Sequence, residues 1–266
     1  MNVSAFRFAP SPNGELHLGH AYSALLNQRM ARQAGRRFLI RVEDIDTIRC
    51  TAELTRRALD DLAWLGLTWE QPVRIQSAHF ADYRAQQMRL ASRGLLYPCF
   101  CSRNKIAAKA SGARRDPEGQ PLYHGTCRAL TLREIEMRIA SGEPHAMRLD
   151  METAVARTRI SEALVWSDVI LVRKDIGTSY HVAVVTDDHL QGITHVVRGR
   201  DLEAATPIHL LLQRLLGFIS PNYHHHELIG DDSGAKLSKS EGAKSLRALR
   251  EEGVMARDIR RALGFD

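Results

Sequence analysis

The sequence lacks the features that mark membrane and secreted proteins. No run of apolar residues is long enough to cross a bilayer, and the first residues do not have the basic-then-apolar layout of a secretory signal. Cysteine is scarce, with four in 266 residues, and a reducing compartment disfavours a disulfide framework. We therefore expect a cytoplasmic protein that makes no membrane contact, whose cysteines serve another purpose.

Two widespread phosphate-binding motifs are also missing. The chain contains neither Gly-x-x-x-x-Gly-Lys-Ser/Thr nor Gly-x-Gly-x-x-Gly, which excludes the commonest nucleotide-binding schemes. With 44% hydrophobic and 26% charged residues, the chain can still bury a substantial core in one or two domains. The excess of 37 Lys and Arg over 31 Asp and Glu, a formal charge of +6, suits a polyanionic partner such as nucleic acid.

The first 42 residues have the pattern of a parallel α/β fold. Residues 3–9 alternate apolar and polar side chains and stop at a Pro- and Gly-rich turn over 10–14. Apolar residues then recur at helical spacing over 19–34, and 37–42 reads as a buried strand. The order strand, turn, helix, strand predicts two parallel strands joined by a helix.

The rest of the chain continues this texture around an insertion. A stretch rich in Gly, Ser, Arg and Pro over 98–126 interrupts it. Helical patterns occupy residues 51–65, 79–92 and 202–216, and strand-like runs occupy residues 163–173, 181–186 and 196–198. We expect a core domain that this insertion divides in two.

Two histidines stand at the predicted start of the first helix. Residues 17–20 read His-Leu-Gly-His, which places His17 and His20 on one side of the helix start, beside free backbone N–H groups. Polyphosphate binds well at such a position, and Gly19 lets a ligand approach the backbone. Two ordinary surface histidines at a helix cap are the alternative interpretation.

A loop bracketed by glycines near the other end carries two lysines. Residues 236–240 read Lys-Leu-Ser-Lys-Ser, and the candidates to contact ATP there are Lys236, Ser238 and Lys239. Lysine ammonium groups on a mobile loop can close over triphosphate charge as it shifts during the reaction. By itself, a basic Ser/Gly loop is usually only a solvated feature.

Together, these segments resemble the two signature motifs of class I aminoacyl-tRNA synthetases. Residues 7–17, the Arg-Val-Glu-Asp-Ile-Asp of 41–46 and the segments 187–189 and 192–199 are similar to the glutamyl and glutaminyl branch of that family. The resemblance implies a Rossmann-like parallel-sheet domain. In this family, the domain binds ATP with Mg²⁺ and activates an amino acid as its adenylate. The amino-acid carboxylate is then the nucleophile, so catalysis rests on alignment and charge stabilisation by His17, His20 and Lys239.

The same resemblance assigns an amino-acid pocket. It places Arg7, Tyr180 and Arg198 at a side-chain carboxylate, and Ser11 and Glu43 at the end that carries the ammonium group. An arginine fork matches a carboxylate but not a glutamine amide, so L-glutamate is the expected substrate. Without the resemblance, an ordinary Arg–Glu ion pair and a core tyrosine would be the preferred interpretation.

Three of the cysteines cluster in the insertion and suggest a metal site. Cys99, Cys101 and Cys127 are three thiols that suit tetrahedral Zn²⁺ together with one further ligand. From spacing and ligand chemistry alone the fourth ligand would be His124, whereas short glutamyl-type paralogues carry a tyrosine ligand at the position of Tyr123. We follow the resemblance; three reduced cysteines without metal are the alternative. The adjacent histidines 224–226 are poor ligands, because an extended segment points them to opposite faces.

The resemblance also suggests an acceptor. Only residues 241–266 follow the lysine loop, room for one or two helices and not for the anticodon-binding region of ordinary glutamyl-tRNA synthetases. The short paralogues attach glutamate to the queuosine base in the anticodon of tRNA(Asp). The expected layout is a catalytic domain over 1–85 and 168–235, an α+β insert with the zinc site over 86–167, and a helical C-terminus over 236–266.

Three alternatives concern the tRNA. The basic insert residues can contact phosphates, although a solvated loop explains them equally well; these residues are Arg103, Lys105, Lys109, Arg114 and Arg115. A truncated synthetase acting on a tRNA 3′ end or another small acceptor is one rival to the queuosine assignment. A non-catalytic, zinc-stapled RNA-binding paralogue is another. We expect a monomer.

Overall fold

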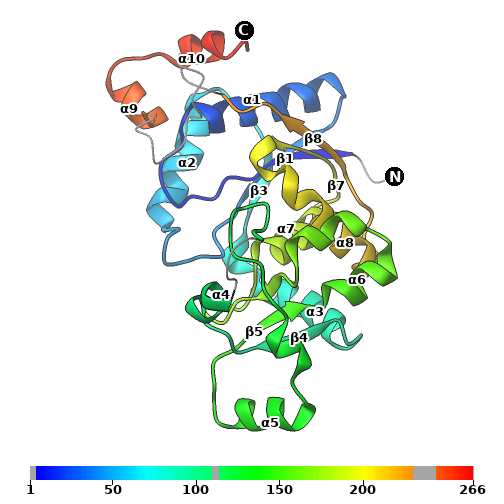
Figure 1. The fold of residues 1–266 in the computed structure, drawn as a ribbon. Helices are drawn as coiled ribbons and strands as arrows, with labels where there is room; N and C mark the ends of the chain where they lie inside the picture. Colours follow the sequence, from blue (N-terminus) through cyan, green and yellow to red (C-terminus); the bar gives the residue numbers. More distant parts are fainter. Residues whose placement is uncertain (1–3, 110–113, 230–243, 266) are drawn as a thin grey trace. The chain divides into compact units, whose positions relative to one another are not determined.

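The structure is a computed structural model that describes residues 4–109, 114–229 and 244–265 and forms two compact units (Figure 1). The first unit comprises Met1–His79, Leu190–Glu203 and Pro221–Asp266, and the second comprises Phe80–His189 and Ala204–Ser220. Within the described residues, none of the helices combines the length and the apolar character needed to span a membrane.

The first unit is built on a five-stranded parallel sheet of order β3-β2-β1-β7-β8. Its elements are β1 (Ala5–Phe8), α1 (Leu18–Gln33), β2 (Arg37–Val42), α2 (Ala52–Trp64), β3 (Glu70–Ile75), β7 (Ile193–Gly199), β8 (Asn222–His226), α9 (Leu246–Glu251) and α10 (Ala256–Ala262). Because all neighbouring strands are parallel, their carboxyl ends lie at one edge of the sheet. The predicted parallel α/β class is confirmed.

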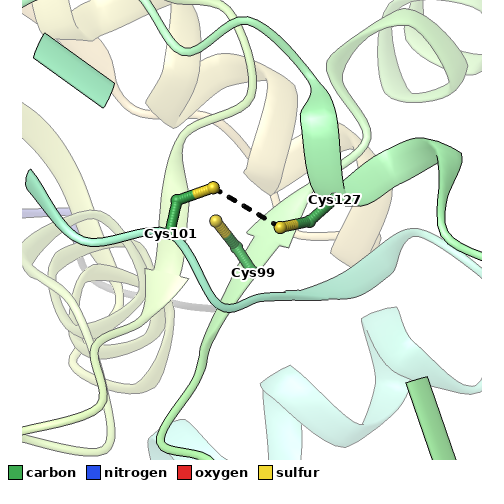
Figure 2. A group of neighbouring side chains, drawn as sticks. All are labelled: Cys99, Cys101 and Cys127. Atoms are coloured by element: carbon green, nitrogen blue, oxygen red, sulfur yellow. Dashed lines mark hydrogen bonds between the residues drawn. The ribbon is translucent and has the colours of Figure 1, made fainter. Parts of the chain in front are cut away.

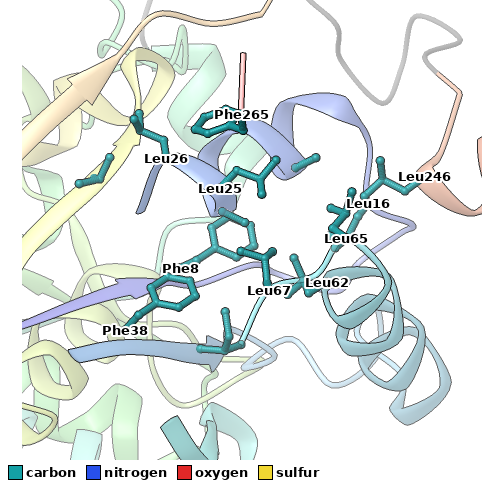
Figure 3. Close-up of a cluster of buried hydrophobic side chains, with 14 of the residues drawn as sticks. Phe8, Leu16, Leu25, Leu26, Phe38, Leu62, Leu65, Leu67, Leu246 and Phe265 are labelled. Atoms are coloured by element: carbon teal, nitrogen blue, oxygen red, sulfur yellow. The ribbon is translucent and has the colours of Figure 1, made fainter. Parts of the chain in front are cut away.

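The two faces of this sheet bury different clusters. Phe6, Phe8, Phe38 and Ile40 point to the face that α1 and α2 cover, where residues of the C-terminal helices and Phe265 complete the core (Figure 3). Ala5 of β1 and Leu39 of β2 alternate with these residues and point to the opposite face, where they join Ile193 and Val196 of β7 in a smaller cluster. In β1 and β2, period-two alternation therefore decides which side chains reach which face.

The second unit contains a three-stranded antiparallel sheet of order β4-β5-β6 together with helices. Its elements are α3 (Phe80–Ala91), β4 (Leu96–Cys99), α4 (Arg103–Lys109), α5 (Leu132–Ala140), β5 (Ala146–Leu149), α6 (Met151–Thr158), β6 (Ile170–Val172), α7 (Tyr180–Leu190) and α8 (Thr206–Leu216). An α+β texture was expected of the insertion, and the antiparallel sheet agrees with it.

Two expected strands differ in the structure. The run 181–186 lies inside α7, and the run 163–173 is a 3-10 helix, Ser161–Trp166, followed by the short β6. Val182, Val184 and Val185 of α7 are all at most 1% exposed. A helix buried on every side has a continuous apolar run, which periodicity cannot distinguish from a buried strand. The prediction of a strand over 181–186 was therefore wrong.

Candidate functional site

The two signature histidines cap the first helix. His17 is the N-cap residue of α1, and its Nδ1 accepts a hydrogen bond from the Gly19 N–H at 3.1 Å. His20 accepts in return, through its own Nδ1, from the His17 N–H at 3.2 Å. The ring centroids are 4.0 Å apart. This reciprocal arrangement is a capping box in which imidazoles replace the usual hydroxyl and carboxylate.

The capping bonds determine the tautomer of both imidazoles. A ring nitrogen that accepts a backbone N–H carries no proton, so in the neutral rings of His17 and His20 the proton lies on Nε2. Each ring is therefore a donor at Nε2, beside the positive end of the α1 dipole. Two such donors are suited to the oxygens of a phosphate chain.

Gly19 is needed in this arrangement for space. A Cβ added at Gly19 would lie 3.0 Å from Cε1 of His17, so a larger residue would displace the imidazole. The other predicted ATP contacts, Lys236, Ser238 and Lys239, lie outside the described residues. Their assignment stays a prediction.

Three arginines share one face of the sheet, near the carboxyl ends of β2, β1 and β7. Arg41 follows Leu39 by two residues and Arg198 follows Val196 by two, while Arg7 pairs in register with Leu39. All three are on the face opposite α1 and are at most 4% exposed. Guanidinium groups keep their charge when buried, so the fold concentrates positive charge at this edge.

Glu43 and Ser11 lie at the same edge, directly after their strands. The Glu43 N–H donates to the carbonyl of Pro10 at 2.9 Å, which ties the segment after β2 to the segment after β1. A carboxylate oxygen of Glu43 accepts from Nη2 of Arg41 at 2.9 Å. The Ser11 hydroxyl lies 3.7 Å from the thiol of buried Cys50. The structure thus brings Arg7, Ser11, Glu43 and Arg198 to one edge of one sheet.

Two residues of β8 contact Arg198 that the sequence interpretation did not assign to the site. Nε of Arg198 lies 3.5 Å from Nε2 of His225, and its guanidinium is 5.2 Å from the ring centre of Tyr223. Burial, and then the charge of Arg198, lower the pKa of the His225 imidazole, which keeps it neutral and able to accept. Histidines 224–226 do lie in an extended strand, β8. Because side chains alternate along a strand, Tyr223 and His225 share one face, and this alternation was the signal in the sequence that could have grouped them.

Tyr180 belongs to the second unit and begins α7. Its ring is 5.5 Å from those of His181 and His209. Nδ1 of His181 and Nε2 of fully buried His209 are 3.2 Å apart. In the same helix, Asp187, from one of the segments that resemble the family, accepts a hydrogen bond from the Tyr83 hydroxyl at 2.9 Å.

The three clustered cysteines converge in the second unit. Cys99 ends β4, Cys101 follows it, and Cys127 comes from the short helix Thr126–Ala129; Figure 2 shows their sulfur atoms facing one another. All three sulfurs lie within 4.8 Å of one another, and those of Cys101 and Cys127 are 3.6 Å apart. Four ligands around tetrahedral zinc with Zn–S bonds of about 2.3 Å place sulfurs roughly 3.8 Å apart. The spacing fits a metal of this kind.

The two candidates for a fourth ligand differ in their surroundings. Tyr123 is 6% exposed, and its hydroxyl accepts the backbone N–H of Cys127 at 2.8 Å. Burial, and then hydrogen bonding with Cys127 and Cys99, raise the pKa of this phenol. His124 is exposed, and its Nδ1 lies 2.5 Å from the hydroxyl of Thr126. Of the two, Tyr123 is the side chain in contact with the thiols.

Two further properties of the cysteine cluster concern the side chains around it and the protonation of its thiols. The guanidinium of buried Arg148 lies 3.9 Å from the ring centre of Tyr123, a cation–π contact with the face of the ring. Burial raises the pKa of the Cys101 thiol to about 11, so this thiol is protonated at neutral pH until a metal replaces the proton.

A cavity of about 560 Å³ adjoins Tyr123 in the second unit. Three cations line it, Lys109, Arg114 and Arg128, together with the carboxylates of Glu152 and Asp168. Arg128 lies 3.4 Å from Glu152 and 3.6 Å from Asp168, so its charge is largely compensated. Of the five basic residues of the insertion, Lys109 and Arg114 line this cavity.

Known proteins resemble the chain over nearly its full length. The family of class I tRNA synthetases (E and Q), catalytic domain, matches residues 4–264. A Glutamyl-Q tRNA(Asp) synthetase of Rhodobacter capsulatus is 46% identical over 97% of this chain and 99% of its own length. A protein of the same name from Symbiobacterium thermophilum is 40% identical over 93% of this chain and 81% of its own length.

Longer relatives match through part of their length. A Glutamate–tRNA ligase of Aquifex aeolicus is 39% identical over 94% of this chain but only 54% of its own length. The crystal structure of a glutamate tRNA ligase from Elizabethkingia meningosepticum, 24% identical, superposes with a TM-score of 0.78 over 99% of this chain and 60% of that chain. The superposition establishes that the folds agree.

Proposed function

Because the chain belongs to the class I tRNA synthetase family of the glutamyl and glutaminyl type, we propose that it activates L-glutamate with ATP and transfers it to the queuosine base in the anticodon of tRNA(Asp). The observation that carries this proposal is the 46% identity to the Rhodobacter protein over almost the whole of both chains. The chain is a ligase, and we propose that it acts as a monomer. Its catalytic part comprises residues 1–85 and 168–235 in this proposal, and the acceptor-contacting insert 86–167.

The first step forms a mixed anhydride. The α-carboxylate of glutamate attacks the α-phosphorus of ATP, the bond to the β-phosphate oxygen breaks, and pyrophosphate leaves with the electron pair. Mg²⁺ bound with ATP supplies neutralisation of part of the triphosphate charge. His17 and His20 donate from Nε2 to phosphate oxygens as negative charge shifts toward the leaving group. Lys236, Ser238 and Lys239 are proposed to bind the same phosphates.

The second step transfers the glutamyl group. An acceptor hydroxyl on the queuosine base attacks the activated carbonyl and loses its proton, the bond to the adenylate oxygen breaks, and AMP leaves with the electron pair. Arg7 and Arg198, with Tyr180, are proposed to hold the side-chain carboxylate through both steps, and Ser11 and Glu43 the ammonium end. The support for the pocket is that Arg7 and Arg198 are buried on one face of the sheet, where two guanidinium groups suit a carboxylate.

The acceptor is tested with two tRNA preparations. Radiolabelled glutamate is expected to attach to tRNA(Asp) that carries queuosine but lacks its terminal adenosine, because the anticodon base and not the 3′ end accepts it. It is not expected to attach to intact tRNA(Asp) with guanosine in place of queuosine. The reverse result would identify a truncated synthetase that charges a 3′ end, and failure of glutamate-dependent ATP–pyrophosphate exchange would favour a non-catalytic RNA-binding protein.

We further propose that Cys99, Cys101, Tyr123 and Cys127 hold one structural Zn²⁺. The thiol spacing and the buried position of Tyr123 beside these thiols support this ligand set. The metal would join β4 to the helix Thr126–Ala129 within a unit whose local apolar cluster is small.

Metal content separates Tyr123 from His124. Wild type and His124→Ala are each expected to hold one zinc per chain, whereas Tyr123→Phe is expected to bind zinc more weakly and to lose it to a mild chelator, because one of the four ligands is gone. Cys127→Ser should lose the metal and unfold at a lower temperature. Cys50→Ser, which removes a thiol outside the cluster, is the control for cysteine replacement. Full zinc retention in Tyr123→Phe would contradict the tyrosine assignment.

A further inference from the structure

Arg41 is a fully buried guanidinium in the sheet of the first unit. It is 0% exposed and lies near the carboxyl end of β2. A guanidinium cannot lose its charge, and burial of the charge is costly unless hydrogen-bond acceptors hold it. The guanidinium of Arg41 therefore needs hydrogen-bond acceptors at fixed positions in the folded protein.

Two side chains from separate segments supply acceptors. Nη2 of Arg41 donates to Oε1 of Glu43 at 2.9 Å, and the Glu43 side chain is only 10% exposed. Nη1 donates to Oε1 of Gln191, which precedes β7, at 3.1 Å. Because the guanidinium is planar and rigid, an acceptor on each Nη fixes its plane and so the position of the Glu43 carboxylate.

We propose that Arg41 is a positioning residue for the ammonium end of L-glutamate. The inference rests on the proposed function, in which Glu43 receives that ammonium group. Arg41 acts through Glu43: its hydrogen bond sets the side-chain conformation in which the carboxylate meets the substrate. Gln191 accepts a hydrogen bond from Arg41 in turn, so a series of two hydrogen bonds connects Gln191, just before β7, through Arg41 to Glu43 in the proposed amino-acid pocket.

The same strand provides a matched control. Arg37 lies on the same face of β2 as Arg41 and also pairs with a glutamate, donating to both carboxylate oxygens of Glu70 at 2.6 Å. These partners are 35% and 42% exposed, an ordinary surface ion pair. Arg37→Met therefore removes an Arg–Glu pair from β2 without touching Glu43.

The experiment measures ATP–pyrophosphate exchange in the full chain. The KM for glutamate is expected to rise about 10- to 100-fold in Arg41→Lys and about threefold in Gln191→Met. In both variants the KM for ATP should stay within about twofold of wild type. Glutarate, which lacks the amino group, is measured as a competitive inhibitor against glutamate. Its inhibition constant should change less than twofold, because it makes no contact through an ammonium group. Arg37→Met should leave all three constants unchanged.

Two outcomes would overturn the inference. Glutamate KM values within twofold of wild type in both folded variants would do so, as would equal weakening of glutamate and glutarate, which would indicate general damage to the pocket. If Arg41→Lys does not fold, Gln191→Met decides alone. Absence of exchange in wild type would instead refute the proposed function itself, so the two failures are distinguishable.

Discussion

Replacing His20 with glutamine is expected to slow glutamate-dependent ATP–pyrophosphate exchange by about 10²- to 10³-fold, and His17→Asn should have an effect of the same size. Both imidazoles accept backbone N–H groups through Nδ1, which leaves Nε2 as a donor toward phosphate. An amide whose oxygen takes over the capping bond does not hold its N–H at the place of the imidazole Nε2, and loss of one preorganised donor from a developing charge raises the barrier by about 3 to 4 kcal/mol. The loss should fall on kcat, with the KM for glutamate little changed.

The substitutions are chosen so that the helix start survives. Asparagine is a good N-cap residue and glutamine a good third residue of a capping box, so both can retain the bonds that His17 and His20 make at the start of α1. Thr131→Ala is the control, since it breaks the capping box of α5 and should cost about 1 kcal/mol of stability without slowing exchange. If His20→Gln kept wild-type kcat, the histidines would be structural caps and nothing more.

Replacing Arg198 with methionine is expected to lower kcat/KM for glutamate by about 10³-fold, because the substrate carboxylate would then enter a buried site without its cation. The KM for ATP should change little. Discrimination against glutamine should fall as well, since the arginine fork is what rejects the amide. Steady-state exchange with glutamate and with glutamine measures both effects.

Arg198→Lys and His225→Phe refine this test. Lysine keeps the charge but loses the planar fork, so it should recover only part of the activity. His225→Phe removes the acceptor 3.5 Å from Nε of Arg198 and should raise the glutamate KM several-fold while preserving the preference for glutamate over glutamine. Unchanged selectivity in Arg198→Met would show that this arginine does not read the substrate side chain.

Local sequence signals predicted the first part of the fold well. The strand, turn and helix over residues 3–34 and the strand over 37–42 all appear in the structure, at β1, α1 and β2. These elements depend on residues that are close in the sequence. Alternating apolar and polar side chains favour the strands, Pro and Gly favour the turn, and apolar residues at a period of 3.6 favour the helix. The cysteine cluster was equally visible, because a single residue separates Cys99 from Cys101 and the third thiol, Cys127, follows in the same polar insertion.

Other features depended on contacts between distant residues. Whether residues 181–186 form a helix or a strand is settled by burial on all sides, which makes the two patterns alike in sequence. The pairing of Arg198 with His225 arises from the register of β7 against β8, 27 residues apart along the chain.

The histidine and lysine motifs were recognisable from residue order alone, because the turn before a helix start and the spacing of His17 and His20 are local properties. That order could not show that these rings cap their own helix through Nδ1. Nor could it show that Arg7, Arg41 and Arg198 meet on one face, since three separate strands bring them there. The different surroundings of Tyr123 and His124 have the same origin: the two residues are adjacent in the sequence, but only Tyr123 is buried beside the thiols.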